Sequence, residues 1–135
     1  MNRIALGFKL AAAYNLAIIP LSQGFGDALG RVDPLFSPAG CVAVLLWGAA
    51  YFSIARRFHL VPGLVLVFAI EKAFYGLHWL AWMSERSSEL PAMLETDPLT
   101  GIFYSTYGAG DFAFMMFFGW VAYRVRTGTT AATPD

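Results

Sequence analysis

The sequence predicts an all-α integral membrane protein whose four helices cross the bilayer and pack as one bundle. Hydrophobic residues make up 58% of the 135 residues and charged residues only 13%, whereas an ordinary soluble domain carries roughly 25% charged residues. Four apolar stretches each come close to the roughly 20 residues that a helix needs to cross the hydrocarbon. None of them alternates polar and apolar residues as a membrane barrel strand would.

The four apolar stretches cover residues 4–21, 39–55, 60–82 and 103–123. A cleaved signal peptide is the alternative for the first stretch, because Arg3 precedes the apolar run from Leu10 to Ile19. No A-x-A cleavage pattern follows that run, so a membrane span is favoured.

The connections between the four stretches differ in character. The first, over residues 22–38, is rich in Gly and Pro and predicts a structured turn region. The second is a tight hairpin at residues 56–59. In the third, Ser87 followed by Pro91 predicts a short interfacial helix to about Glu95. Residues 127–135 are rich in Thr, Ala and Pro, which predicts a disordered tail.

Lysine and arginine are distributed unequally between the two predicted sides of the membrane. One side has six of them, namely Arg3, Lys9, Arg56, Arg57, Arg124 and Arg126. The other side has only Arg31 and Arg86. Because cytoplasmic segments carry the excess of basic residues, both termini are predicted to be cytoplasmic.

Three charged residues fall inside the predicted spans. Glu71 and Lys72 lie near the middle of the third span, and Asp111 lies in the outer half of the fourth. An ionisable group at such depth costs about 2.5–3.5 kcal/mol on insertion scales. A partner group or a water-filled cavity must offset that cost.

Helical spacing groups further residues with these charges. Glu71, Tyr75, His78 and Trp82 recur at i, i+4, i+7 and i+11 and share one face of the third helix. Tyr107 shares a face with Asp111, and Asn15 lies near the middle of the first span. The spacing predicts an internal polar pocket that is walled by aromatic rings and opens toward the outer side. Its predicted ligand or proton site consists of Asn15, Glu71, Lys72, Tyr75, His78, Tyr107 and Asp111.

The same residues allow a purely structural interpretation. Lys72 can pair with Asp111, or Glu71 with His78, so that the pair fixes how the helices pack. Polar contacts between membrane helices contribute on average less than about 1 kcal/mol. As a stability device alone the cluster gains little, which favours a functional role for Glu71 and Asp111.

Several kinds of function are disfavoured by what the sequence contains. The net charge is zero, which disfavours a nucleic-acid partner. The lone Cys41 cannot form an internal disulfide or a CxxC motif. Two histidines, His59 and His78, lie nineteen residues apart and cannot both bind one haem iron. No hydrolase motif, phosphate loop or zinc spacing is present, so no catalytic residue, metal or cofactor is predicted.

Two short segments come nearest to a signature, Glu71-Lys72-x-x-Tyr75-Gly76-x-His78-Trp79 and Gly110-Asp111-Phe112. With four short spans in 135 residues, the whole chain resembles the DoxX-like and BphX-like small membrane proteins of bacteria. The resemblance implies a multi-pass protein of the bacterial inner membrane. Some members of these families are encoded among genes for aromatic-compound breakdown or electron transfer. The resemblance assigns a role to no residue of this chain.

Three hypotheses of function follow. The leading one is a protein whose pocket binds a hydrophobic or aromatic small molecule, a quinone or a lipid. A second is a structural or assembly subunit of a larger membrane complex, with the polar groups facing a partner chain. A third is a small proton-coupled transporter that works as a homo-oligomer. An enzyme that moves protons with buried carboxyl groups is the least favoured interpretation.

Overall fold

Helices and turns account for all the regular structure of residues 2–129, which are the residues that the computed structural model describes. The predicted all-α class is therefore confirmed. Four long helices cover the four apolar stretches, and short helices fill the connections. The helices are α1 (Arg3–Leu21), α2 (Ala28–Val32), η1 (Pro34–Phe36), α3 (Pro38–Ile54), η2 (Phe58–Leu60), α4 (Pro62–Arg86), η3 (Ser87–Glu89), α5 (Leu90–Thr96) and α6 (Pro98–Arg126).

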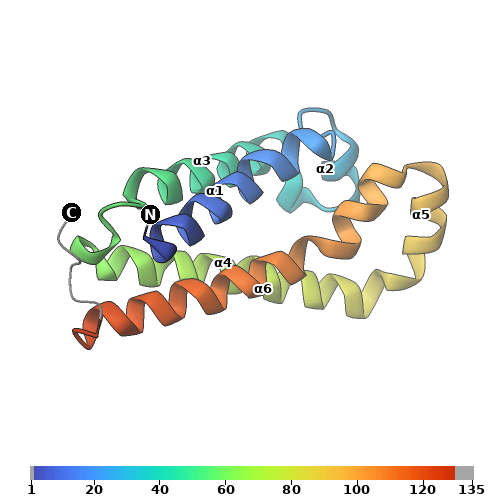
Figure 1. The fold of residues 1–135 in the computed structure, drawn as a ribbon. Coiled ribbons are helices and arrows are strands. Elements are labelled where there is room, and N and C mark those ends of the chain that lie inside the picture. The colour runs from blue at the N-terminus through green and yellow to red at the C-terminus, as the bar shows by residue number, and fades with distance from the viewer. Residues whose placement is uncertain (1, 130–135) are drawn as a thin grey trace.

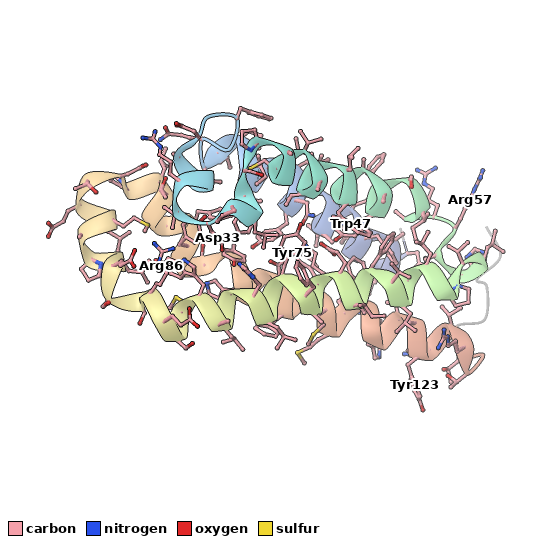
Figure 2. All side chains as sticks on the ribbon, turned by 180° about the vertical axis from the view of Figure 1, so that it is seen from behind. Asp33, Trp47, Arg57, Tyr75, Arg86 and Tyr123 are labelled. Carbon is pink, nitrogen blue, oxygen red and sulfur yellow. The ribbon has the colours of Figure 1, made fainter. Side chains whose placement is uncertain are left out.

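The four long helices pack as two pairs, α1 with α3 and α4 with α6 (Figure 1). Both ends of the described chain lie at the end of the bundle where α3 joins α4, which we call the basic end. The helices α2 and α5 lie at the opposite end, which we call the cap end. Arg57 lies at the basic end, whereas Asp33 and Arg86 lie toward the cap end (Figure 2).

The last helix begins earlier than its predicted span. The Asp97 carboxylate accepts a hydrogen bond from the Thr100 amide, and Pro98 occupies the first turn. This capping starts α6 at the turn after α5, five residues before the predicted 103. The predicted short helix after Ser87 is present as η3 and α5. Of the predicted tail, residues 127–129 form a turn on the end of α6, and residues 130–135 lie outside the described residues.

Two apolar clusters fill the bundle, one toward each end. The cluster at the basic end contains Phe8, Tyr51, Phe58, Phe68 and Phe118. The cluster at the cap end contains Leu29, Phe36, Trp82, Tyr104 and Tyr107. Along α1, α4 and α6, the buried residues Asn15, Glu71, Lys72 and Asp111 fall between the residues that join one cluster and those that join the other. The chain therefore forms a polar layer between two apolar ones.

The outward-facing side of α4 is apolar along most of its length. Between Gly63 and Ala81, every exposed residue of α4 is apolar, including Phe74 and Leu77. Two helical stretches are long and apolar enough to cross a membrane, Arg3–Leu21 and the continuous Pro62–Thr96. The helix α3 is apolar, but it is shorter than those two stretches. The helix α6 is long enough, but its Gly, Tyr and Asp111 residues lower its mean hydropathy.

Candidate functional site

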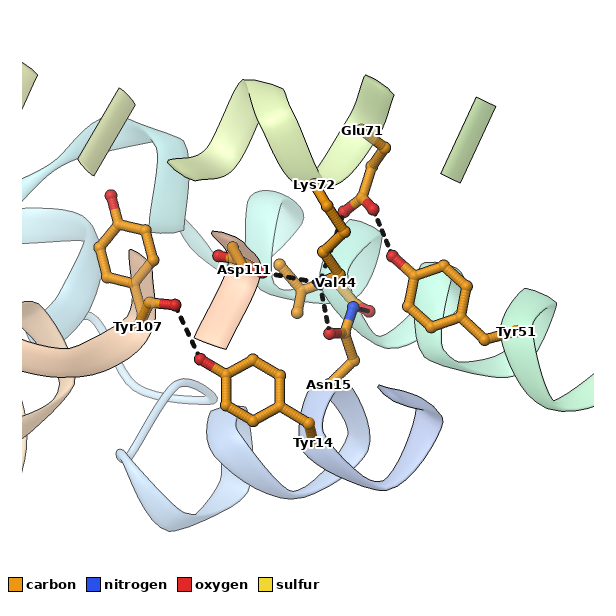
Figure 3. Close-up of polar contacts among 8 residues, drawn as sticks. All are labelled: Tyr14, Asn15, Val44, Tyr51, Glu71, Lys72, Tyr107 and Asp111. Carbon is orange, nitrogen blue, oxygen red and sulfur yellow. Dashed lines mark hydrogen bonds and ion pairs between the residues drawn. The ribbon is translucent and has the colours of Figure 1, made fainter. Parts of the chain in front are cut away.

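The site is centred on Lys72, whose side chain lies inside the bundle and is 1% exposed. Its ammonium donates hydrogen bonds to Asp111 Oδ1 at 2.7 Å and to Asn15 Oδ1 at 2.8 Å (Figure 3). These three residues come from α4, α6 and α1, so the contacts tie together helices of both pairs. Of the two pairings that the sequence allowed as a structural clasp, the one between Lys72 and Asp111 is formed.

Glu71 has a different partner from the one that the sequence allowed. Its Oε2 accepts a hydrogen bond from the hydroxyl of Tyr51 on α3. Its Oε1 lies 3.9 Å from Lys72 Nζ, and no hydrogen-bond donor within residues 2–129 reaches it. Because Asn15 also donates to the Val44 carbonyl of α3 at 3.1 Å, all four long helices meet here. We call Asn15, Tyr51, Glu71, Lys72 and Asp111 the polar layer.

Sequence reasoning missed Tyr51. It is an aromatic residue in an otherwise apolar helix, and nothing in its spacing relates it to Glu71. Depth gave no signal either, because Tyr51 lies five residues before the hairpin at 56–59 and Glu71 twelve residues after it.

The polar layer is bounded by aromatic rings. The Lys72 ammonium lies 5.7 Å from the ring centre of Tyr14 and 5.4 Å from that of Tyr51, within the range of a cation–π contact. The Tyr14 hydroxyl donates to the Tyr107 carbonyl at 2.8 Å and links α1 to α6. Tyr107 itself is 2% exposed, and its hydroxyl has no hydrogen-bond partner among the described residues.

His78 does not join the polar layer. It lies 2.5 Å from Asp33 through its Nε2, near the cap end of the bundle. Seven residues of helix separate Glu71 from His78, about 10 Å along the axis, so their pairing does not form. Of the two alternative pairings, the one between Glu71 and His78 is therefore not formed. The structure brings together the other predicted residues, Asn15, Glu71, Lys72, Tyr75, Tyr107 and Asp111, around one cavity.

On the side of the cap end, Phe36 of η1 forms part of the wall of this cavity. Phe36 packs edge-on against the stacked rings of Phe103 and Tyr107, with ring centres 4.8 and 4.9 Å away. Hydrogen bonds to the neighbouring backbone hold this segment in place. They run from Arg86 to the Val32 carbonyl at 2.6 Å and from Tyr104 to the Leu29 carbonyl at 2.7 Å. Residues 22–38 thus form a structured region, as predicted, and it lies over the bundle.

The cavity inside the polar layer is small. Its volume of about 20 Å³ has room for roughly one water molecule. Its walls include the carboxylates of Glu71 and Asp111, the Lys72 ammonium and the rings of Tyr75 and Tyr107. Such a space can hold the polar head of a ligand, and the ligand's body needs space elsewhere.

A larger groove lies beside the cavity, between α1 and α6. Its volume is about 330 Å³, within the range of roughly 300–1,000 Å³ that is usual for small-molecule sites. We call it the side groove, and its walls are Tyr14, Ala17, Ile18, Leu21, Ser22, Leu99, Ile102, Phe103 and Thr106. Three of these residues, Tyr14, Ile18 and Phe103, also line the cavity. The side groove and the cavity are therefore neighbouring spaces that share part of their walls.

Metal ligands do not gather at this site. Within residues 2–129, no three His, Cys, Asp or Glu side chains are close enough together to hold a metal ion. Cys41 is buried, and its thiol donates to the Phe36 carbonyl at 3.4 Å. The chemistry that the site offers is hydrogen bonding and charge in an apolar surrounding.

No family model, curated protein or solved structure matches this chain. The resemblance to DoxX-like and BphX-like proteins therefore stays a prediction.

Proposed function

We propose that this chain spans the inner membrane four times and binds a hydrophobic small molecule whose polar head reaches the polar layer. The observation that carries the binding proposal is the common wall of two spaces. Tyr14, Ile18 and Phe103 line both the apolar side groove and the charged cavity. A molecule from the lipid phase, such as a quinone, an aromatic compound or a lipid, can place its body in the groove and its head in the cavity.

The distribution of charge supports the four spans. Lys72 and Asp111 lie inside the bundle, whereas large apolar side chains such as Ile70, Phe74 and Met116 point outward. In water this arrangement exposes a large apolar surface, which soluble monomers rarely do. In a bilayer the same surface faces lipid, and the buried charges are paired within the bundle. Arg56 and Arg57 at the basic end favour a cytoplasmic position for that end and for both termini.

The contacts of the polar layer favour ligand binding over the role of an assembly subunit. In the subunit hypothesis, the charges face a partner chain across the outer surface. Here Lys72 bonds to Asn15 and Asp111 of its own chain, and all three point inward. The outer surface at the same depth carries apolar groups that suit lipid. The transporter hypothesis also requires a homo-oligomer. The contacts of the polar layer are made within one chain and do not depend on a second copy.

Filling the side groove is expected to displace the ligand. Ala17 lines the groove, so Ala17→Trp places an indole where the ligand body would lie. Ala13, one turn earlier on α1, is exposed but does not line the groove, so Ala13→Trp is the matched control. After purification in mild detergent, mass spectrometry of the extracted molecules should find one hydrophobic compound in near-stoichiometric amount with the wild type and Ala13→Trp. Ala17→Trp should retain about tenfold less of it.

Retention of the same compounds in the same amounts by all three proteins would rule out the side groove as a binding site. Equal loss from both tryptophan variants would show a general effect on the bundle, which also counts against the proposal.

A further inference from the structure

The polar layer contains more carboxyl groups than ammonium groups. Glu71 and Asp111 supply two carboxyl groups against the single ammonium of Lys72, and all three side chains are more than nine-tenths buried. Among residues 2–129, the only other ionisable groups that line the cavity are the hydroxyls of Tyr14, Tyr75 and Tyr107, which are neutral near pH 7. His78, Asp33 and Arg86 lie toward the cap end and do not line the cavity. With both carboxyl groups ionised, the layer has a formal charge of −1.

The hydrogen bonds show which carboxylate oxygen carries the excess negative charge. Lys72 is bonded to Asp111 and Asn15, and Tyr51 is bonded to Glu71 Oε2. Glu71 Oε1 is buried and accepts no hydrogen bond within the described residues, although Glu71 lines the cavity. A carboxylate oxygen only accepts hydrogen bonds, so the group that satisfies it must be a donor. Buried charge is stabilised by an opposite charge, so a cationic donor suits this position best.

The cavity also limits the size of that donor. A space of about 20 Å³ fits a group the size of one water molecule, such as a primary ammonium. A trimethylammonium group is several times larger and does not fit. The rings of Tyr14, Phe36, Tyr75, Phe103 and Tyr107 form much of the wall, and their faces attract a small cation.

From this juxtaposition we infer that the ligand is a hydrophobic primary amine. Its ammonium occupies the cavity and donates to Glu71 Oε1, while its alkyl or aryl body lies in the side groove. This inference rests on the proposed function, because it uses the same groove and the same cavity. It adds the chemical class of the head group and makes Glu71 the residue that recognises it.

Three probes with the same tail separate the properties of the head group. Dodecylamine, dodecanol and dodecyltrimethylammonium are titrated into the full-length protein in phosphatidylcholine nanodiscs, and heat from empty nanodiscs is subtracted. Dodecylamine should bind saturably with one site per chain, about tenfold or more tighter than the two other probes. Glu71→Gln should weaken dodecylamine about tenfold and leave dodecanol unchanged. Asp27→Asn, which removes an exposed carboxylate of the Arg31 pair, should change neither.

Two outcomes would overturn the amine assignment, and they differ in what they mean for the binding site. Saturable binding of dodecanol that matches or exceeds that of dodecylamine, and that Ala17→Trp abolishes, keeps the proposed site but rejects the amine. No saturable binding of any probe rejects both. If Glu71→Gln does not fold, the comparison of dodecylamine with dodecanol on the wild type decides alone.

Discussion

Replacing Lys72 by Met is expected to lower the free energy of unfolding by about 3–5 kcal/mol, as is usual when one partner of a buried ion pair is removed. Lys72 is the only cation in the polar layer, and Asp111 bonds to it at 2.7 Å. Without the ammonium, Asp111 stays buried with no opposite charge, and Asn15 loses the donor to its Oδ1. Titration with SDS from mixed micelles, followed by circular dichroism, measures the change.

The double variant and an exposed pair provide the controls. Lys72→Met combined with Asp111→Asn removes both charges, so it should recover a large part of the lost stability. Arg31→Met breaks the ion pair with Asp27, whose side chains are 72% and 73% exposed, and should change stability by at most about 1 kcal/mol. If Lys72→Met proved as mild as Arg31→Met, the ion pair would not be the buried contact described here.

Adding one methyl group at Gly108 is expected to destabilise the bundle by about 1–3 kcal/mol, the usual range for overpacking. A Cβ at this position would overlap the indole ring of Trp79. That ring cannot move away freely, because its Nε1 donates to the Tyr104 carbonyl at 2.8 Å. Gly108→Ala should therefore push α4 and α6 apart beside the polar layer. Thermal unfolding in detergent, monitored by circular dichroism, gives the midpoint.

Gly119 on the same helix is the matched control for this substitution. A Cβ there meets no atom within 4 Å. Gly119→Ala should be neutral or stabilising by up to about 1 kcal/mol, because Ala is the better helix former. Equal midpoints for the two variants would mean that α4 and α6 do not approach as closely at Gly108 as described.

The helices could be predicted because the length of each apolar stretch, and the residues that end it, determine where a helix lies. Each apolar stretch became one helix, and Pro and Gly marked the first and third connections, whereas Arg56 and Arg57 interrupted the apolar pattern at the second. The inward direction of Glu71, Tyr75 and Asp111 also followed from helical spacing, because a charge in an apolar helix turns toward other polar groups. These features depend on residues close together in the sequence.

Partners across the bundle were beyond the reach of that reasoning. The contact of Glu71 with Tyr51 depends on how α3 and α4 are rotated about their axes, which packing of Phe68 and Phe118 decides. The contact of His78 with Asp33 depends on the path of the connection over residues 22–38. Periodicity describes one helix at a time, so it identified the inner face of α4 but could not identify Asp33 as the partner of His78.

The side groove was missed for a related reason. It exists because α1 packs mainly on α3 and α6 mainly on α4, so that α1 and α6 stay partly separate. Nothing in the apolar pattern of either helix distinguishes a packed face from one that leaves a gap. Such a gap appears only when the two helix pairs are placed side by side.

Cysteine labelling tests most directly whether the apolar surface lies in a membrane with the polar layer inside. In a Cys41→Ala background, three single variants are compared in spheroplasts with a membrane-impermeant maleimide: Glu95→Cys at the cap end, Thr127→Cys at the basic end, and Phe74→Cys on the outer surface between them. The account predicts that Glu95→Cys reacts at once, Thr127→Cys reacts only after permeabilisation, and Phe74→Cys reacts in neither case. Phe74 is 54% exposed on the bundle, so rapid labelling of Phe74→Cys would show water at the proposed lipid surface and contradict the account.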